Sequence, residues 1–174
     1  MSESVVRLRP VAREDLDLLA KWANDPIHTS EYNSFGFQFT GHLEEEFGKN
    51  GLIDPRGGAL IVIKSETDDI IGSVSYHQVR HGPNEGSVAY NIGITLSPDQ
   101  RGKGYGTEAQ RLFAAYLFST YTVMRVEAST DVTNIAEQRA LEKAGFTREG
   151  VMRKAQWRSG AWHDLIMYSK LRGE

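Results

Sequence analysis

The feature that most constrains this 174-residue chain is a glycine-rich turn that joins an expected strand to an expected helix. Three glycines alternate with other residues in the turn, and the helix after it carries apolar residues at the spacing of one helix face. A helix N-terminus presents unpaired backbone N–H groups and a positive dipole end, and glycines let an anion approach the backbone closely. The turn therefore predicts a phosphate or pyrophosphate site formed by Arg101, Gly102, Lys103, Gly104, Tyr105, Gly106 and Thr107.

The residues between the glycines support this interpretation. Arg101 and Lys103 bring positive charge to the place where a diphosphate would lie, and Thr107 offers a hydroxyl donor or a cap for the helix. A dinucleotide-binding turn requires the spacing G-x-G-x-x-G in a βαβ unit, whereas the spacing here is G-x-G-x-G after strands that form meanders. A Walker loop is excluded because this sequence has no Gly-Lys-Ser/Thr at the required spacing. A tight turn that needs positive φ, without any ligand, is the remaining alternative.

Hydrophobic periodicity predicts a single α/β (α+β) domain over residues 1–174. The expected strands cover residues 5–9, 59–63, 70–79, 87–96 and 125–129, with two more after Phe146 around a Ser159-Gly160 turn. The expected helices cover residues 16–24, the segment after the glycine-rich turn, and residues 134–144, while residues 27–56 should form short helices and loop. Together they predict a mixed, largely antiparallel sheet of about seven strands with helices on both faces.

Composition limits the chemistry and the partners. The chain has no cysteine, so it cannot form a disulfide, a thiolate nucleophile or a cysteine metal site, and we expect no metal. A net charge of −3 with mixed signs gives no general attraction to nucleic acid or to anionic lipid, and no apolar run approaches a membrane span. Charged residues crowd the start of the chain, which is incompatible with a secretory signal. We expect an unprocessed, cytoplasmic protein without nucleic-acid or membrane partners.

The run from Arg101 to Gly106 matches a known pyrophosphate motif in full: Arg or Gln, two residues, Gly, one residue, then Gly or Ala. In this respect the sequence resembles the Gcn5-related N-acetyltransferase (GNAT) superfamily. Further segments resemble its ribosomal-protein N-acetyltransferase (RimJ/RimL) branch. They span nearly the whole chain: Leu8-Arg9-Pro10, Trp22-Ala-Asn-Asp-Pro26, Asn134 followed by Arg139, Leu141-Glu-Lys-Ala-Gly-Phe146, Glu149-Gly150, and Trp162-His-Asp164 with Tyr168.

The resemblance implies a GNAT fold and acetyl-coenzyme A (acetyl-CoA) as co-substrate. It implies that the backbone amides of Arg101 through Thr107 hold the pyrophosphate. It further implies that backbone groups around Leu96 bind the pantetheine arm, where the strand bulges away from its neighbour. Asn134 would contact the pantetheine from the following strand–helix junction; a helix N-cap is the alternative role, and one side chain can fill both.

Acyl transfer from a thioester to an amine requires a neutral amine, a donor for the developing oxyanion and a proton for the leaving thiolate. A backbone N–H near Leu96 can supply the oxyanion donor. The resemblance implies a tyrosine and a serine near the sulfur, and these positions carry Leu141 and Glu137 here. Glu137 is a candidate acid if desolvation raises its pKa; the simpler interpretation is an exposed glutamate paired with a neighbour such as Arg139.

The general base stays open. The resemblance implies carboxylates at two positions that carry amides here, Asn91 and Gln156. Glu127, on an expected core strand near the cofactor junction, is the candidate that we favour, and a structural pairing with an arginine is its alternative. Other groups that could accept or relay a proton are Glu31, Tyr90 and His77. In a mechanism without a dedicated base, the domain positions the small neutral fraction of the amine and bulk water takes the proton.

The sequence therefore predicts an enzyme that transfers an acyl group, most simply acetyl, from acyl-CoA to a primary amine in a ternary complex. The acceptor is a protein N-terminus or a small amine. Because familiar reactive groups are replaced, a CoA-binding sensor without catalysis is the second hypothesis. Five aromatic residues precede the first long hairpin, and we expect them mainly to pack, with stacking on a substrate as the alternative: Trp22, Tyr32, Phe35, Phe37 and Phe39. The hairpin that carries Trp157 and Trp162 could support a dimer, so monomer and homodimer both stay open.

Overall fold

A computed structural model describes residues 4–174 of the chain. Its strands are β1 (Val6–Pro10), β2 (Ile53–Asp54), β3 (Gly57–Lys64), β4 (Ile70–Arg80), β5 (Val88–Leu96), β6 (Arg125–Asp131), β7 (Thr147–Arg158) and β8 (Ala161–Leu171). Its α-helices are α1 (Leu16–Ala23), α2 (Pro26–Thr29), α3 (His42–Asn50), α4 (Tyr105–Thr120) and α5 (Ile135–Lys143). Each expected strand and helix is present with bounds shifted by a few residues. The segment expected to form short helices and loop contains α2 and α3, and also the short strand β2, which was not expected.

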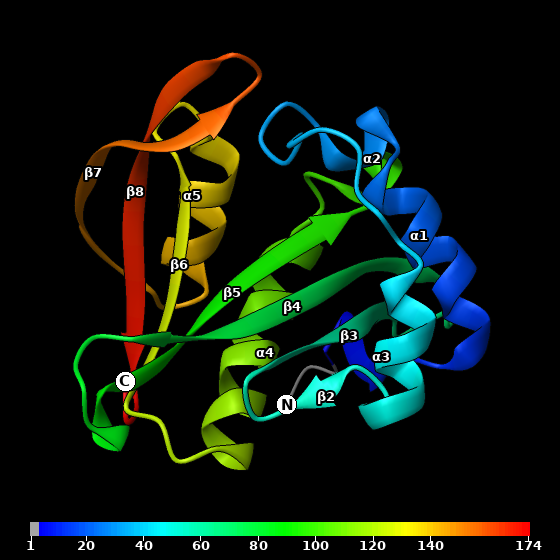
Figure 1. Ribbon diagram of the computed structural model, residues 1–174, viewed down its shortest axis with the longest axis horizontal. Helices are drawn as coiled ribbons and strands as arrows, with labels where there is room; N and C mark the ends of the chain where they lie inside the picture. Colours follow the sequence, from blue (N-terminus) through cyan, green and yellow to red (C-terminus); the bar gives the residue numbers. More distant parts are fainter. Residues whose placement is uncertain (1–3) are drawn as a thin grey trace.

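The strands form one mixed sheet in the order β1-β3-β4-β5-β6-β8-β7, with β2 paired to one end of β3. Within the described residues, β5 and β6 are the parallel pair and the other pairs are antiparallel. The crossover that parallel strands require is made by α4, which runs behind the sheet in Figure 1. The predicted fold class, with its mixed and largely antiparallel sheet, is confirmed.

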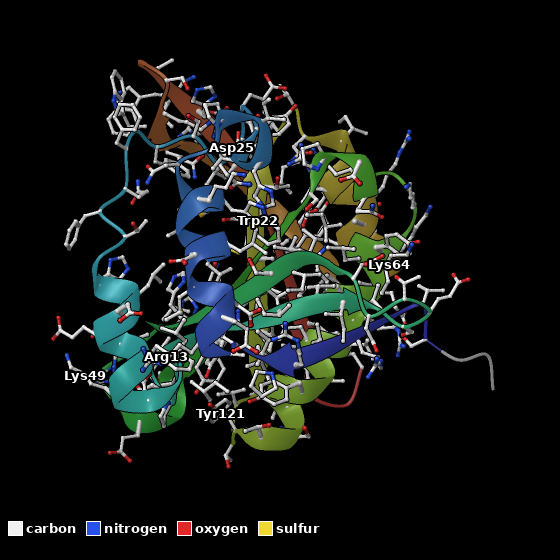
Figure 2. All side chains as sticks on the ribbon, turned by 90° about the vertical axis from the view of Figure 1, so that its right-hand side faces the viewer. Arg13, Trp22, Asp25, Lys49, Lys64 and Tyr121 are labelled. Carbon is white, nitrogen blue, oxygen red and sulfur yellow. The ribbon has the colours of Figure 1, made fainter. Side chains whose placement is uncertain are left out.

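Helices cover both faces of the sheet, and β3 shows why. Leu60 and Val62 belong to a core cluster that contains Phe113 and Leu117 of α4. The alternate residues of β3, Ile61 and Ile63, belong to a second cluster that is closed by residues of α1 and α3: Leu16, Leu19 and Phe47. Successive side chains of a strand point to opposite faces, so this continuous apolar run is buried from two sides. Figure 2 shows α1 and α3 together on the outer face of the sheet.

The parallel strands β5 and β6 separate soon after they meet. They pair at Tyr90 with Val126 and at Asn91 with Glu127, and no further pair follows. In Figure 1 the two strands diverge toward the top of the view, while β5 keeps its regular pairing with β4 up to Leu96. The resemblance implied that the strand bulges away from its neighbour around Leu96. The structure shows regular pairing of β5 with β4 up to Leu96, and the neighbour from which β5 departs is β6.

The divergence leaves backbone groups of β5 without a strand partner. The amide of Ser97 donates to the carbonyl oxygen of Ile71, which makes this a hydrogen-bonded pair of the β4–β5 ladder. In an antiparallel ladder such pairs alternate with pairs whose N–H and C=O groups point away from the partner strand. The amides of Leu96 and Ile94 therefore point away from β4, into the gap between β5 and β6.

The loop between α2 and α3 differs from its expectation. We expected its aromatic side chains mainly to pack, but Phe37 and Phe39 are 98% and 80% exposed, and Phe35 is about half exposed. The loop is held instead by polar contacts, because the side chain of Asn24 bonds both the carbonyl oxygen and the amide of Gln38, at 2.9 and 2.8 Å. These phenylalanines thus form part of the outer surface.

Among the described helices, none combines the length and the apolar character that crossing a membrane requires.

Candidate active site

The glycine-rich turn connects β5 to α4 with backbone that only glycine adopts easily. Gly102 and Gly104 have φ values of +73° and +83°, and Gly104 is the N-cap of α4. A Cβ atom built at either position would meet no protein atom within 4 Å, so the space beside these two glycines is open. Thr107 therefore lies in the first turn of α4 and does not cap it, contrary to one of its two expected roles. The turn keeps the geometry of an anion site.

Arg101 is used differently from what the sequence predicts. Its guanidinium donates to the backbone carbonyl oxygens of Leu96 at 3.0 Å, of Ile27 at 3.3 Å, and of His28. These bonds tie α2 to the C-terminal end of β5. The positive charge of Arg101 stays beside the turn, but the side-chain donors are already bound to protein, so the turn offers an anion mainly backbone amides and the exposed Lys103.

His28 is buried under this contact and was not singled out from the sequence. Its ring stacks on Trp22 with centroids 4.1 Å apart, and its Nε2 has no hydrogen-bond partner among the described residues. Figure 2 places Trp22 near the end of α1, just below Asp25 at the start of α2. Burial, together with the charge of Arg101, lowers the pKa of His28 to about 4. The ring is therefore neutral near pH 7.

We expect His28 to make folding stability depend on pH. The unfolded state takes up the proton near pH 6.5, whereas the folded state resists it down to about pH 4. The contribution of His28 to the free energy of unfolding is therefore fully present above pH 6.5. It is lost as the pH drops toward 4, by about 3 kcal/mol. Urea unfolding across this range should show a flatter dependence for His28→Phe, which keeps the stack but cannot titrate. His42→Phe, at an exposed site, should not change the slope. An unchanged slope in His28→Phe would contradict the assignment.

A narrow cavity of about 110 Å³ lies where β5 and β6 diverge. Asn134 and Glu137 at the start of α5 form part of its lining. The side chain of Asn134 accepts from the amide of Glu137 at 3.3 Å and donates to Thr130 Oγ1 at 3.1 Å, so the predicted N-cap is confirmed. Its predicted contact with pantetheine stays a prediction.

Glu137 is neither exposed nor paired with Arg139, which corrects the simpler interpretation of this residue. It lies half-buried in the cavity wall, and no hydrogen bond or ion pair joins it to Arg139 within the described residues. Burial raises the pKa of its carboxyl group to about 7, although the side chain of Gln110 on α4 partly opposes the shift. The side chain of Glu137 is half-buried by its exposed area, but its carboxyl group is desolvated more strongly than this area suggests, because the surrounding cavity wall shields it from bulk solvent. Glu137 can hold a proton at neutral pH.

A second group of polar residues is centred on Asp131, which lines the narrow cavity, and the sequence analysis did not single it out. The carboxylate of Asp131 accepts from the amide and hydroxyl of Thr133, each at 2.8 Å, and from the guanidinium of Arg158. His163 Nδ1 lies 3.0 Å from the same carboxylate. Burial opposes ionisation, but these bonds outweigh it and lower the pKa of Asp131 to about 2. Asp131 could be suspected from its place before Asn134, whereas its partners depend on the β7–β8 hairpin.

A wider cavity of about 470 Å³ lies on the sheet face opposite α4. Its floor is formed by Ser75 of β4 and by Gly93 and Thr95 of β5, and its wall comes from α1, α2 and the loop after α2. The two cavities share Asn33, Gly93 and Ile94. A molecule in the gap between β5 and β6 and a second molecule on the open face would therefore meet beside the middle of β5.

Glu127, the favoured base, does not line either cavity. Its buried carboxylate accepts from Arg125 Nε at 2.7 Å and lies 2.9 Å from His81 Nε2, while Arg125 also binds Glu149 through two bonds of 2.6 Å. This geometry matches the structural alternative, an arginine partner. Of the other proton-transfer candidates, Tyr90 lies in the core and donates to the carbonyl oxygen of Pro55 at 2.6 Å, while Glu31 and His77 are exposed. Gln156 lines the narrow cavity.

The chain as a whole is similar to known proteins. A family model described as acetyltransferase (GNAT) domain matches residues 6–147, which is most of the chain. The chain belongs to the GNAT acetyltransferase family. The predicted superfamily is thus confirmed, and the chain is an N-acetyltransferase.

Individual relatives agree with this membership. The chain is 25% identical over 169 residues to the uncharacterized N-acetyltransferase p20 of Bacillus licheniformis, covering 96% of this chain and 93% of that protein. A spermidine N-acetyltransferase from Vibrio cholerae, solved with CoA and spermine, has a TM-score of 0.81 at 20% identity and covers 98% and 97% of the two chains. A ribosomal-protein-S5-alanine acetyltransferase from Vibrio fischeri has a TM-score of 0.78 at 21% identity over 100% and 97%.

The structural likenesses establish the GNAT fold, and the relatives named N-acetyltransferases do not favour the sensor hypothesis. The route of proton transfer and the kind of amine that is accepted depend on this chain's own residues.

Proposed function

We propose that this GNAT enzyme transfers an acetyl group from acetyl-CoA to a primary amine by direct attack in a ternary complex. The observation that supports it best is the meeting of two cavities at Gly93 and Ile94, beside a glycine-rich helix start. One cavity continues the gap between β5 and β6, and the other opens to the surface. Two substrates can thus enter from different sides and react without a covalent enzyme intermediate, which suits a chain without cysteine.

The residues present fit CoA. The backbone amides from Arg101 to Thr107 would hold the pyrophosphate, helped by the dipole of α4 and by Lys103. The amides of Ile94 and Leu96, which point into the gap, would bind the amide groups of the pantetheine arm, and Asn134 would contact the same arm. CoA supplies the acetyl group as an activated thioester.

The chain's own groups would manage charge and protons as follows. The amine nitrogen attacks the thioester carbonyl carbon while a backbone N–H of β5 donates to the developing oxyanion. The carbon–sulfur bond breaks, and protonated Glu137 donates its proton to the departing thiolate. Solvent in the wider cavity takes the proton that the amine loses and later reprotonates Glu137. Glu127 is not required in this scheme, and the base-free mechanism applies.

The proposal is tested by calorimetry with acetyl-CoA combined with an assay of free thiol in the presence of amines, among them small primary amines and short peptides with free N-termini. We expect binding of acetyl-CoA and acceptor-dependent thiol release, with the acetylated amine identified by mass spectrometry. Binding without turnover on any amine would contradict catalysis and support the sensor hypothesis.

A further inference from the structure

The walls of the two joined cavities offer very little free negative charge. Among the described residues that line them, Asp131 and Glu137 are the ones with a carboxyl group. Both lie in the narrow cavity, and the wider cavity, where the acceptor would bind, is lined by neutral side chains. The resemblance implied carboxylates at two positions close by, and these carry the amides Asn91 and Gln156.

Neither carboxyl group is free to bind a second cation. Both oxygens of Asp131 are engaged, one by Thr133 and the other by Arg158 with His163 beside it. The charge of Asp131 is thus already compensated by a buried guanidinium. Glu137 is desolvated and protonated in a large fraction of molecules at neutral pH, so it attracts an ammonium group only weakly.

The polar groups that do line the wider cavity are neutral hydrogen-bonding groups. Asn33 and Gln38 carry side-chain amides, and Ser75 and Thr95 carry hydroxyls on the exposed floor. Phe35 supplies apolar surface beside them. Amides and hydroxyls pair with neutral polar groups of a substrate, whereas an extra ammonium group taken out of water without a carboxylate partner is disfavoured.

We propose that the wider cavity selects amines whose remaining groups carry no positive charge, and that it discriminates against polyamines. This inference rests on the proposed acetyl transfer and narrows its acceptor class. Its consequence is that a structural neighbour known as a spermidine acetyltransferase and this chain share a fold but differ in the charge of the acceptor that they prefer.

Two matched acceptor pairs test the proposal with the full-length enzyme and acetyl-CoA. Putrescine and mono-N-acetylputrescine present the same aminobutyl group, and the peptides Ala-Lys-Ala-amide and Ala-Gln-Ala-amide present the same N-terminal amine. Within each pair the members differ by one positive charge. We expect kcat/KM to be higher for the neutral member by about 10-fold or more, corrected for the two equivalent amines of putrescine and for the site of peptide acetylation.

A variant pair at the cavity floor reports on the cause. Ser75→Asp places a carboxylate where an extra ammonium would lie, and Ser75→Asn is the uncharged control of the same size. We expect Ser75→Asp to reduce the preference for the neutral member several-fold, in a manner that 0.5 M salt weakens, and Ser75→Asn to leave it unchanged. The affinity for CoA, measured by calorimetry, should stay the same in both variants because Ser75 is remote from the glycine-rich turn.

The outcomes separate the two levels of the proposal. Equal or better use of the charged member in a pair that is turned over overturns the charge selection and leaves acetyl transfer intact. A shift in preference that is equal in Ser75→Asp and Ser75→Asn also overturns it. Binding of acetyl-CoA without turnover of any amine overturns acetyl transfer itself, and the acceptor inference with it.

Discussion

Replacing Gly104 with valine should lower the affinity for CoA by ~100-fold or more, while the domain still folds. A Cβ atom at Gly104 would stand in open space beside the turn, where we propose that the pyrophosphate binds, and a branched side chain would prevent close approach of a phosphate. Losing two charge-assisted hydrogen bonds costs about 3 kcal/mol, which corresponds to that factor. Calorimetry with CoA measures it directly.

Strain has to be separated from blocking, because the φ of +83° at Gly104 is itself unfavourable for valine. Gly51 provides the matched control: it has a φ of +65°, it ends helix α3, and a Cβ atom there would also meet nothing within 4 Å. Gly51→Val should lose a similar amount of stability, about 1–2 kcal/mol. Its affinity for CoA should be normal. If both variants bind CoA as the wild type does, the pyrophosphate site is wrongly placed.

Replacing Glu137 with glutamine should slow turnover by ~100-fold without weakening CoA binding. Glutamine keeps the shape of the side chain but has no acidic proton for the thiolate, and a positioned general acid contributes about that factor or more. The carboxyl group of Glu137 loses its proton as the pH rises through about 7. The ratio of wild-type to variant kcat/KM should therefore be largest below pH 7 and fall above it, and this ratio cancels the titration of the amine.

Two other glutamates serve as controls for Glu137. Glu142 lies on the same helix and accepts from the phenol of Tyr168 at 3.0 Å, a bond that Glu142→Gln can keep, so its activity should stay within about 2-fold. Glu127→Gln should lower the free energy of unfolding because it weakens the contacts with Arg125 and His81. The ratio of wild-type kcat/KM to that of Glu127→Gln should stay constant with pH around 7. Near-normal turnover of Glu137→Gln would remove Glu137 from the mechanism.

The geometry of the glycine-rich turn was predictable from the sequence because it depends on local backbone. A strand, alternating glycines and a periodic helix lie next to one another along the chain, and the positive φ of Gly104 follows from that order. Gly145 is a similar case: it directly follows the helix expected over residues 134–144, and its φ is +88°. Strands such as β3 were readable for the same reason, since alternation and apolar runs are short-range signals.

The surroundings of the candidate proton-transfer residues could not be predicted from the sequence, because they depend on contacts between distant segments. Arg101 carries the family motif, but its guanidinium is bound by carbonyl oxygens of residues 27 and 28, more than 70 positions earlier. The environment of Glu137 depends on how α5 packs against α4 beside the divergent strands. Asp131 and Arg158 are 27 positions apart and meet only because the last hairpin folds back over β6.

Because β5 is regular, its backbone groups and its alternate side chains point in different directions. Its backbone amides at Ile94 and Leu96 face the gap proposed for the cofactor, its even-numbered side chains pack toward α4, and Gly93 and Thr95 face the cavity proposed for the acceptor. A substitution on the acceptor-facing positions can thus change which amine is used while the backbone that binds the cofactor is untouched. In a strand built in this way, the acceptor preference and the cofactor contacts can therefore change independently of each other.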